Sequence, residues 1–367
     1  MRYKTFTLFV VACVLLLAGM TAFAGNPKQT GTTGASELLI PVGARSTALS
    51  GSNIATVSGI DAVYWNPAGG ALVEGRAEAI LSYQNYIADL NVTYFGAIAN
   101  MGQVGNFGMS IKTISFGDIE QTTVDNPEGN GLTYSPNYLT LGMHYSRKFT
   151  DRIQFGINGK MISEKIMSVK ANGFGLDIGL QYRNENGLRL GIVLSNFGTS
   201  MKFDGSDLEY RVSDLEGSVI NPGRKGEYYN DTPASSVFKS TSMEFELPTQ
   251  LKIGIGYELA INDENMLSLS GTYANNSSFL DQYIAGVEYS FNNMFFLRGS
   301  YSVAYKLGLE GEDDEFVMQG DNYLYGPAFG AGFNLSAGRD FNVKFDYAYQ
   351  TTEFFDDTQW FGFTFGF

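Results

Sequence analysis

Hydrophobic and polar residues alternate along most of the chain after residue 75, and this alternation predicts β-strands. In residues 171–183, for example, Phe174, Leu176 and Ile178 alternate with Gly175 and Asp177. A period of two recurs in segments of about ten residues, the length that a tilted strand needs to cross a bilayer. Fourteen such segments are expected, at 76–87, 91–101, 104–116, 136–148, 152–164, 171–183, 187–198, 249–260, 264–275, 281–291, 294–305, 325–337, 340–350 and 357–367.

The lengths of the connections indicate how these strands are arranged. Every second connection is short, near residues 102, 150, 185, 262, 292 and 338. The long insertions, 117–135, 199–248 and 306–324, fall only on the other connections. An up-and-down barrel of the outer membrane has this asymmetry, with short periplasmic turns and long outside loops, whereas a sandwich has no reason for it. The pattern therefore predicts a 14-stranded antiparallel transmembrane β-barrel.

A membrane barrel accounts for the phenylalanines of the last predicted strand, 357–367. It carries four phenylalanines on one face, and their cover is either a second sheet or lipid; the barrel assigns lipid. Phe363, Phe365 and Phe367 also look like the terminal signal that the outer-membrane assembly machinery recognises in its substrates. Aromatic residues near strand ends, including Tyr83, Tyr145 and Trp360, fit the interfacial girdles of a membrane barrel.

The inward-facing positions carry charges of both signs. A single sign would suggest an ion-selective pore, whereas mixed signs suit a network that ties the wall to a plug. Charges simply solvated in a wet lumen are an equally open reading, because polar interiors are usual in these barrels. The predicted lumen charges are Lys160, Asp177, Arg189, Lys252, Glu258, Glu288, Arg298, Lys344 and Asp346.

Residues 1–24 are expected to form a cleaved signal peptide, with Arg2 and Lys4 before an apolar stretch and an A-x-A site at 22–24. A membrane anchor is the alternative, but the stretch is short. The only cysteine, Cys13, lies in this segment, so disulfides and thiolate metal sites are not expected in the mature chain. A net charge of -14 argues against nucleic acid as a partner, while 44 Gly, 22 Tyr and 28 Phe fit a strand-rich exported protein.

Residues 25–75 precede the first strand and are rich in small residues. They also contain Leu38, Ile40 and Trp65, which need burial. We expect this segment to be a hatch inside the barrel; a flexible periplasmic tail is the alternative. Residues 76–367 would then form the barrel itself.

The same segment carries a family resemblance. The stretch GARSTALSGSNIATVSGIDAVYWNPAGGAL resembles the N-terminal signature of the PorV/PorQ family, within the FadL-like barrel superfamily. The tripeptide Asn66-Pro67-Ala68 is the core of this signature, and the resemblance assigns these three residues to the hatch. Asn-Pro favours a turn, so a structural role is expected for them. The resemblance covers essentially the whole mature chain, apart from the insertions 199–248 and 306–324.

Catalytic and metal chemistry are not expected. The only histidine, His144, points into the barrel, where a hydrogen-bonded role is more usual than a Ser–His or proton-relay site. The acidic stretch 310–315 could bind a hard cation, but it matches no defined loop, and a solvated surface is the simpler reading. We expect that the protein binds no cofactor and has no enzymatic activity. The insertion 199–248 is expected to be a lid or a docking surface.

Two functions are weighed here, and a structural barrel with no transport role is a third possibility. By its resemblance to PorV, the protein would bind proteins exported by a type IX secretion system, together with the translocon. By its resemblance to FadL, it would transport long-chain fatty acids or similar hydrophobic molecules across the outer membrane. Inward apolar residues are few, namely Ile162, Val193, Ile284 and Phe296. That scarcity counts modestly against the second function.

Overall fold

A computed structural model describes residues 33–123, 126–212, 236–277, 279–306, 315–318, 323–336 and 341–367. The predicted signal peptide, residues 1–24, lies outside the described residues, as does most of the acidic stretch 310–315. Within the described part of the chain, no helix is long and apolar enough to cross a membrane.

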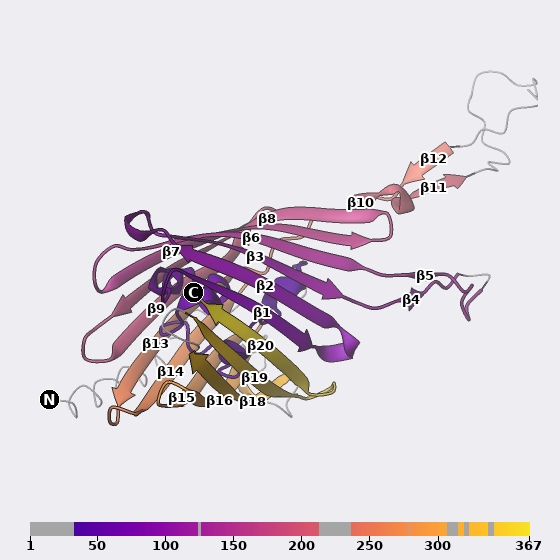
Figure 1. Cartoon of the computed structure of the whole chain (residues 1–367). Helices are drawn as coiled ribbons and strands as arrows, with labels where there is room; N and C mark the ends of the chain where they lie inside the picture. Colours follow the sequence, from indigo (N-terminus) through magenta and orange to yellow (C-terminus); the bar gives the residue numbers. More distant parts are fainter. Residues whose placement is uncertain are drawn as a thin grey trace, which may run out of the picture.

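The chain forms a closed antiparallel barrel of 14 long strands (Figure 1). Each long strand pairs with the next long strand along the chain. Pairing of β1 with β20 joins the first to the last and closes the barrel. The long strands are β1 (Ala77–Asn85), β2 (Asn91–Asn100), β3 (Asn106–Ser115), β6 (Asn137–Lys148), β7 (Ile153–Ile166), β8 (Val169–Arg183), β9 (Leu188–Gly198), β13 (Gln250–Ala260), β14 (Asn265–Asn276), β15 (Asp281–Phe291), β16 (Phe295–Lys306), β18 (Tyr325–Ser336), β19 (Asn342–Thr352) and β20 (Thr358–Gly366).

The predicted strands and the alternation of connection lengths are confirmed. Short turns join β2 to β3, β6 to β7, β8 to β9, β13 to β14 and β15 to β16, and we call this the short-turn end of the barrel. The three long insertions all leave the opposite end, which we call the long-loop end. The predicted fold class is therefore correct, because turn length follows strand direction in an up-and-down barrel.

The insertions carry short strands of their own. One contains the pair β4 (Ile119–Glu120) and β5 (Thr133–Tyr134), and a third contributes β17 (Glu315–Val317), which pairs with β16. The longest contains β10 (Asp204–Gly205), which extends the β8 edge, and the hairpin β11 (Glu209–Val212) and β12 (Ser236–Lys239). Figure 1 shows the β11–β12 hairpin standing well away from the barrel body. The insertion 199–248 therefore has more regular structure than its sequence indicated.

Polar contacts fix the base of the β11–β12 hairpin. Lys239 Nζ lies 2.5 Å from Asp204 Oδ1, and this hydrogen bond lowers the pKa of the Asp204 carboxyl. Hydrogen bonds from the Ser168 side chain and then from its backbone N–H, which lies 3.0 Å from Asp207 Oδ2, lower the pKa of Asp207 as well. Both carboxylates favour the charged form because it holds the hydrogen bonds. The hairpin is thereby joined to the β7–β8 turn.

Residues 33–75, which we call the N-terminal segment, lie inside the barrel. Its elements are short, and Gly43, Gly59 and the Asn66-Pro67 step lie at the starts of α2, η4 and η5. Ile54, Val57, Ile60 and Val63 are almost fully buried, and η5 contacts β6, β7 and β8 of the wall. The elements are η3 (Ser36–Leu39), α2 (Ala44–Thr47), η4 (Gly59–Asp61), α3 (Ala62–Trp65) and η5 (Pro67–Leu72).

The last strand separates its two faces as the alternation predicts, with one correction. Phe363 and Phe367 are 41% and 50% exposed on the outer surface, whereas Phe361 and Phe365 are half-buried. Phe363 packs against Phe345 on the neighbouring strand, with ring centroids 5.0 Å apart. Trp360 was expected in an interfacial girdle, but it is fully buried against Ala44, Ala48 and Ala348. Its even-numbered position places it on the lumen face, opposite the phenylalanines.

Candidate functional site

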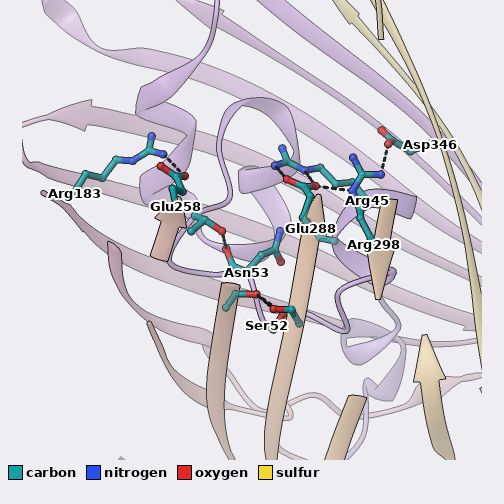
Figure 2. A network of polar contacts seen from close by, with 12 residues as sticks. Arg45, Ser52, Asn53, Arg183, Glu258, Glu288, Arg298 and Asp346 are labelled. Carbon is teal, nitrogen blue, oxygen red and sulfur yellow. Dashed lines mark hydrogen bonds and ion pairs between the residues drawn. The ribbon is translucent and has the colours of Figure 1, made fainter. Parts of the chain in front are cut away.

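The interior of the barrel is the candidate site, and a chain of largely buried ion pairs joins the N-terminal segment to one side of its wall (Figure 2). Arg45 Nη2 of α2 lies 2.9 Å from Glu288 Oε1 of β15. Glu288 Oε2 also accepts from Arg298 Nε at 2.6 Å, and Arg298 Nη1 contacts Asp346 Oδ1 at 2.6 Å. The four groups are mutually compensated, which a buried charge requires. This cluster attaches the N-terminal segment to β15, β16 and β19.

Two further groups of charges connect neighbouring wall strands. Arg183 and Arg189 both reach the carboxylate of Glu258, at 3.2 and 2.6 Å. Lys160 Nζ lies 2.7 Å from Asp177 Oδ1, and that carboxylate also accepts from Asn196 N at 2.8 Å. Asp177 occupies the irregularity in the register between β8 and β9, so these bonds support the wall where its ladder is interrupted.

Seven of the nine predicted lumen charges therefore take part in ion pairs, and two do not. Lys252 lies over the ring of Trp65, 5.8 Å from its centroid, and Lys344 is half-buried on β19. Neither has a carboxylate within ion-pair distance among the described residues. Arg45 and Arg183 were not among the predicted lumen charges. Arg183 shares the inward parity of Asp177, which would have identified it, whereas nothing in the alternation indicates Arg45.

Asn66 organises the predicted Asn66-Pro67-Ala68 motif through both ends of its side chain. The residue is fully buried, and its Oδ1 accepts from Ala68 N at 3.1 Å as the cap of η5. Its Nδ2 donates to Ile54 O at 2.7 Å. Pro67 occupies the first position of the helix, where its missing N–H costs nothing. The motif therefore fixes the turn between α3 and η5.

We expect Asn66→Ala to lower the free energy of unfolding by about 1–3 kcal/mol, because it removes a cap and leaves buried Ile54 O with one donor fewer. The measurement is denaturant unfolding of the detergent-solubilised barrel. The control is Asn100→Ala, which removes an exposed side chain that accepts from Gly102 N at 2.9 Å. Its expected loss is below about 0.5 kcal/mol. Equal losses in the two variants would contradict a structural role for Asn66.

The wall approaches this motif so closely that only glycine fits opposite it. A Cβ at Gly156 of β7 would lie 2.1 Å from Pro67 O, and one at Gly179 of β8 would lie 2.1 Å from Asn66 Oδ1. Neither oxygen can withdraw without moving backbone or breaking the cap. The two glycines therefore form a seat for the N-terminal segment in the wall.

A second attachment lies nearer the long-loop end. Lys112 Nζ of β3 donates to Glu37 O at 2.7 Å and to Ile40 O at 2.5 Å. The Tyr64 hydroxyl donates to Leu38 O at 3.0 Å and to Ile40 O at 2.8 Å. The carbonyls at the end of η3 are thus satisfied by side chains, as a buried helix terminus requires.

The start of the N-terminal segment contacts the base of the longest insertion. Thr33 forms a parallel bridge with Glu246, and Gly34 N donates to Glu246 O at 3.2 Å. Ala35 and Leu38 are buried in one cluster with Met201 and Leu247. The base of the longest insertion and the start of the N-terminal segment are therefore packed as one unit.

A cavity of about 590 Å³ remains between the N-terminal segment and the long-loop end. Leu39, Ile40, Tyr64 and Trp65 of the segment line it, together with strand ends and connections that include Tyr86, Phe279 and Leu324. This volume lies within the range of small-molecule and cofactor pockets, about 300–1,000 Å³. The apolar surface is larger than the few inward apolar wall residues indicated, because the N-terminal segment and the connections supply much of it.

His144 shows no catalytic arrangement among the described residues. It is buried, its Nε2 lies 3.0 Å from Ser146 Oγ, and it packs against Gly70 of η5. Ser146 is itself fully buried, so protein encloses this pair. In the described ranges, no group of three or more His, Cys, Asp or Glu residues could hold a metal ion.

Comparison with known families identifies the chain. Residues 23–214 match the family described as "Type IX secretion system protein PorV". The chain belongs to the PorV family. The match covers the N-terminal segment and the first seven long strands, so the family resemblance predicted from the segment is confirmed. Comparison with curated proteins gives no match.

Solved structures agree on the fold of this PorV family member. The "TodX deltaS2S3 mutant monoaromatic hydrocarbon channel" superposes with a TM-score of 0.53 at 13% identity, covering 88% of this chain and 97% of its own. The "CymD monoaromatic hydrocarbon channel" gives 0.53 at 13% identity, with 90% and 98% covered. The Pseudomonas putida toluene transporter TodX gives 0.50 at 12% identity, with 87% and 96% covered. At such identities the likeness shows the barrel fold alone.

Proposed function

We propose that this protein is an outer-membrane component of a type IX secretion system that binds exported proteins at its long-loop end. The proposal follows from membership of the PorV family. In this proposal residues 1–24 direct export, the short-turn end faces the periplasm, and the outer-membrane assembly machinery recognises the terminal strand with Phe363, Phe365 and Phe367. The translocon and its exported proteins are the expected partners.

The observation that carries the proposal is the β11–β12 hairpin, which stands away from the barrel (Figure 1). A hairpin so far from the barrel wall cannot line a transport pathway through the lumen, but it can contact a bound protein. The contents of the lumen support the same reading. The N-terminal segment is attached by ion pairs and hydrogen bonds to several wall strands, which suits a binding platform more than an open pore.

The β11–β12 hairpin can be removed without changing the hydrogen bond between the residues that flank it. Ser240 N donates to Leu208 O at 2.8 Å, so residues 209–239 can be replaced by an Asn-Gly turn while this pair is kept. We expect the shortened protein to form its barrel but to lose co-purification with exported proteins and a large translocon subunit. The measurement is native mass spectrometry of protein extracted from its own membrane in mild detergent.

The β4–β5 hairpin gives a matched control. Replacing residues 121–132 by the same turn keeps the pairing of Glu120 with Thr133. This variant is expected to retain its partners at the level of the unaltered protein. Full capture of exported proteins by the variant lacking residues 209–239 would overturn the proposed docking role.

A second candidate function is transport of hydrophobic small molecules across the outer membrane. The 590 Å³ cavity favours it, since Tyr64, Trp65 and Phe279 give it an apolar lining. The names of similar structures also refer to hydrocarbon channels and a toluene transporter. A barrel that carries a bound apolar molecule in the same mass spectrum, with no protein partner, would place this function first.

A further inference from the structure

A row of apolar side chains crosses the outer surface of the wall near the β7–β8 hairpin. The register of the strands places Ile111 of β3, Leu141 of β6, Met161 of β7 and Phe174 of β8 side by side. All four side chains are exposed. Because the outer face of a membrane barrel contacts lipid, acyl chains are the expected cover of this apolar row.

Toward the long-loop end, the outward positions of β7 and β8 become polar and then basic. The facing pair two residues beyond the apolar row is Ser163 with Asn172, and the next outward pair is Lys165 with Lys170. Four residues of a strand span about 13 Å, and strands of such barrels are tilted by about 35–45°. The two lysines therefore lie about 10 Å further from the bilayer centre than the apolar row, at the level of lipid headgroups.

Lys165 and Lys170 stand directly opposite each other and are both exposed. Facing residues of an antiparallel pair have Cα atoms about 4.5–5.5 Å apart, so two like charges repel there, and one anion could contact both ammonium groups. Among the described residues, neither lysine has a carboxylate within ion-pair distance. Asp204 stands opposite Lys170 on β10, but Lys239 Nζ holds its carboxylate at 2.5 Å, and Glu164 is buried on the inward face. An anion from outside the protein would compensate the pair.

We propose that Lys165 and Lys170 bind the phosphate group of a phosphorylated glycolipid in the outer leaflet, with its acyl chains against Met161 and Phe174. A free anion would contact only the two ammonium groups, whereas a lipid also covers the apolar row beside them. The inference goes beyond the proposed function and takes from it only the outward orientation of the long-loop end. The bound lipid would lie beside Ser168, whose backbone N–H donates to Asp207 at 3.0 Å, and so next to the base of the β11–β12 hairpin.

Lipid titration followed by native mass spectrometry tests the proposal on the whole protein in mild detergent. The probes are monophosphoryl lipid A and the same lipid after enzymatic removal of its phosphate. We expect the phosphorylated lipid to bind at least about tenfold more tightly, because it alone forms charge-assisted hydrogen bonds with the two lysines. Inorganic phosphate in large excess is expected to leave most of the lipid bound. Complete displacement by inorganic phosphate would show a site for free anions and would overturn the assignment to a lipid.

Three double variants separate the lysine pair from general charge and from folding. Lys165→Gln with Lys170→Gln is expected to abolish the preference for the phosphorylated lipid, and Lys165→Arg with Lys170→Arg to retain it. Without lipid, the glutamine variant should be at least as stable as the unaltered protein, because it removes a repulsion between facing charges.

The matched control is Arg147→Gln with Lys148→Gln, which removes two exposed cations near the short-turn end and is expected to leave the lipid preference unchanged. Equal binding of the two lipids by the unaltered protein would overturn the proposal. So would a preference that persists in the glutamine variant of Lys165 and Lys170, or one that falls equally in the control.

Discussion

Replacing Glu288 by alanine is expected to lower the free energy of unfolding by about 3–5 kcal/mol, the usual cost of removing one partner from a buried ion pair. Glu288 holds Arg45 at 2.9 Å and Arg298 at 2.6 Å, and the side chains of Glu288 and Arg298 are only 7% and 2% exposed. Without it, Asp346 still compensates Arg298, but Arg45 becomes an unpaired cation beside it. The measurement is denaturant unfolding in detergent micelles.

The matched control removes an ion pair of the same length from the surface. Arg152 Nη2 lies 2.8 Å from Glu185 Oε1, with side chains 53% and 82% exposed. Solvent screens this pair, so Arg152→Ala is expected to cost less than about 1 kcal/mol. Arg45→Ala should fall between the two, because it leaves Glu288 paired with Arg298. Similar losses for Glu288→Ala and Arg152→Ala would show that the buried cluster does not hold the barrel together.

Replacing Gly156 by valine is expected to displace the N-terminal segment and to raise the ionic current through the barrel in a planar bilayer. A Cβ at this position would lie 2.1 Å from Pro67 O, and backbone cannot yield as a flexible side chain can. Overpacking of this kind costs about 1–3 kcal/mol or more, and here the segment can relieve it by leaving its seat. Stability should therefore fall while the wall strands remain paired.

Gly159 on the same strand provides the control, because a Cβ there would meet nothing within 4 Å. Gly159→Val is expected to change neither the current nor the midpoint of unfolding. A Gly156→Val barrel as impermeable and as stable as Gly159→Val would show that the segment adapts to the wall. The close fit would then have no part in closing the lumen.

The barrel could be predicted from the sequence because its two determinants are local. Alternation with a period of two defines each strand, and the length of each connection defines which end it belongs to. Trp360 was misplaced for a different reason. Its aromatic type and its place near a strand end suggested the interface, although its parity relative to Phe361 already assigned it to the lumen. For a wall residue, parity was the stronger signal.

The candidate site was harder to predict because its contacts join distant parts of the chain. Parity placed Glu288 and Arg298 in the lumen, but it could not indicate that Arg45, 243 residues before Glu288, completes the cluster. The N-terminal segment has no period of its own, so neither its turns nor their neighbours follow from a pattern. The cavity could not be predicted for the same reason, because much of its apolar lining belongs to the N-terminal segment.

The parallel bridge between Thr33 and Glu246 has a mechanical consequence. Glu246, which follows the β11–β12 hairpin in the same insertion, accepts a hydrogen bond from Gly34 N, so tension applied to the hairpin by an attached protein and carried along the insertion would act on the start of the N-terminal segment. The next contact along the N-terminal segment is made at Glu37 and Ile40, whose carbonyls accept hydrogen bonds from Lys112 Nζ. The turn held by Asn66 comes later in the segment. Force on the hairpin would thus displace the start of the N-terminal segment first, next to the cavity. The contacts of the segment with Gly156 and Gly179 would still be intact at that point.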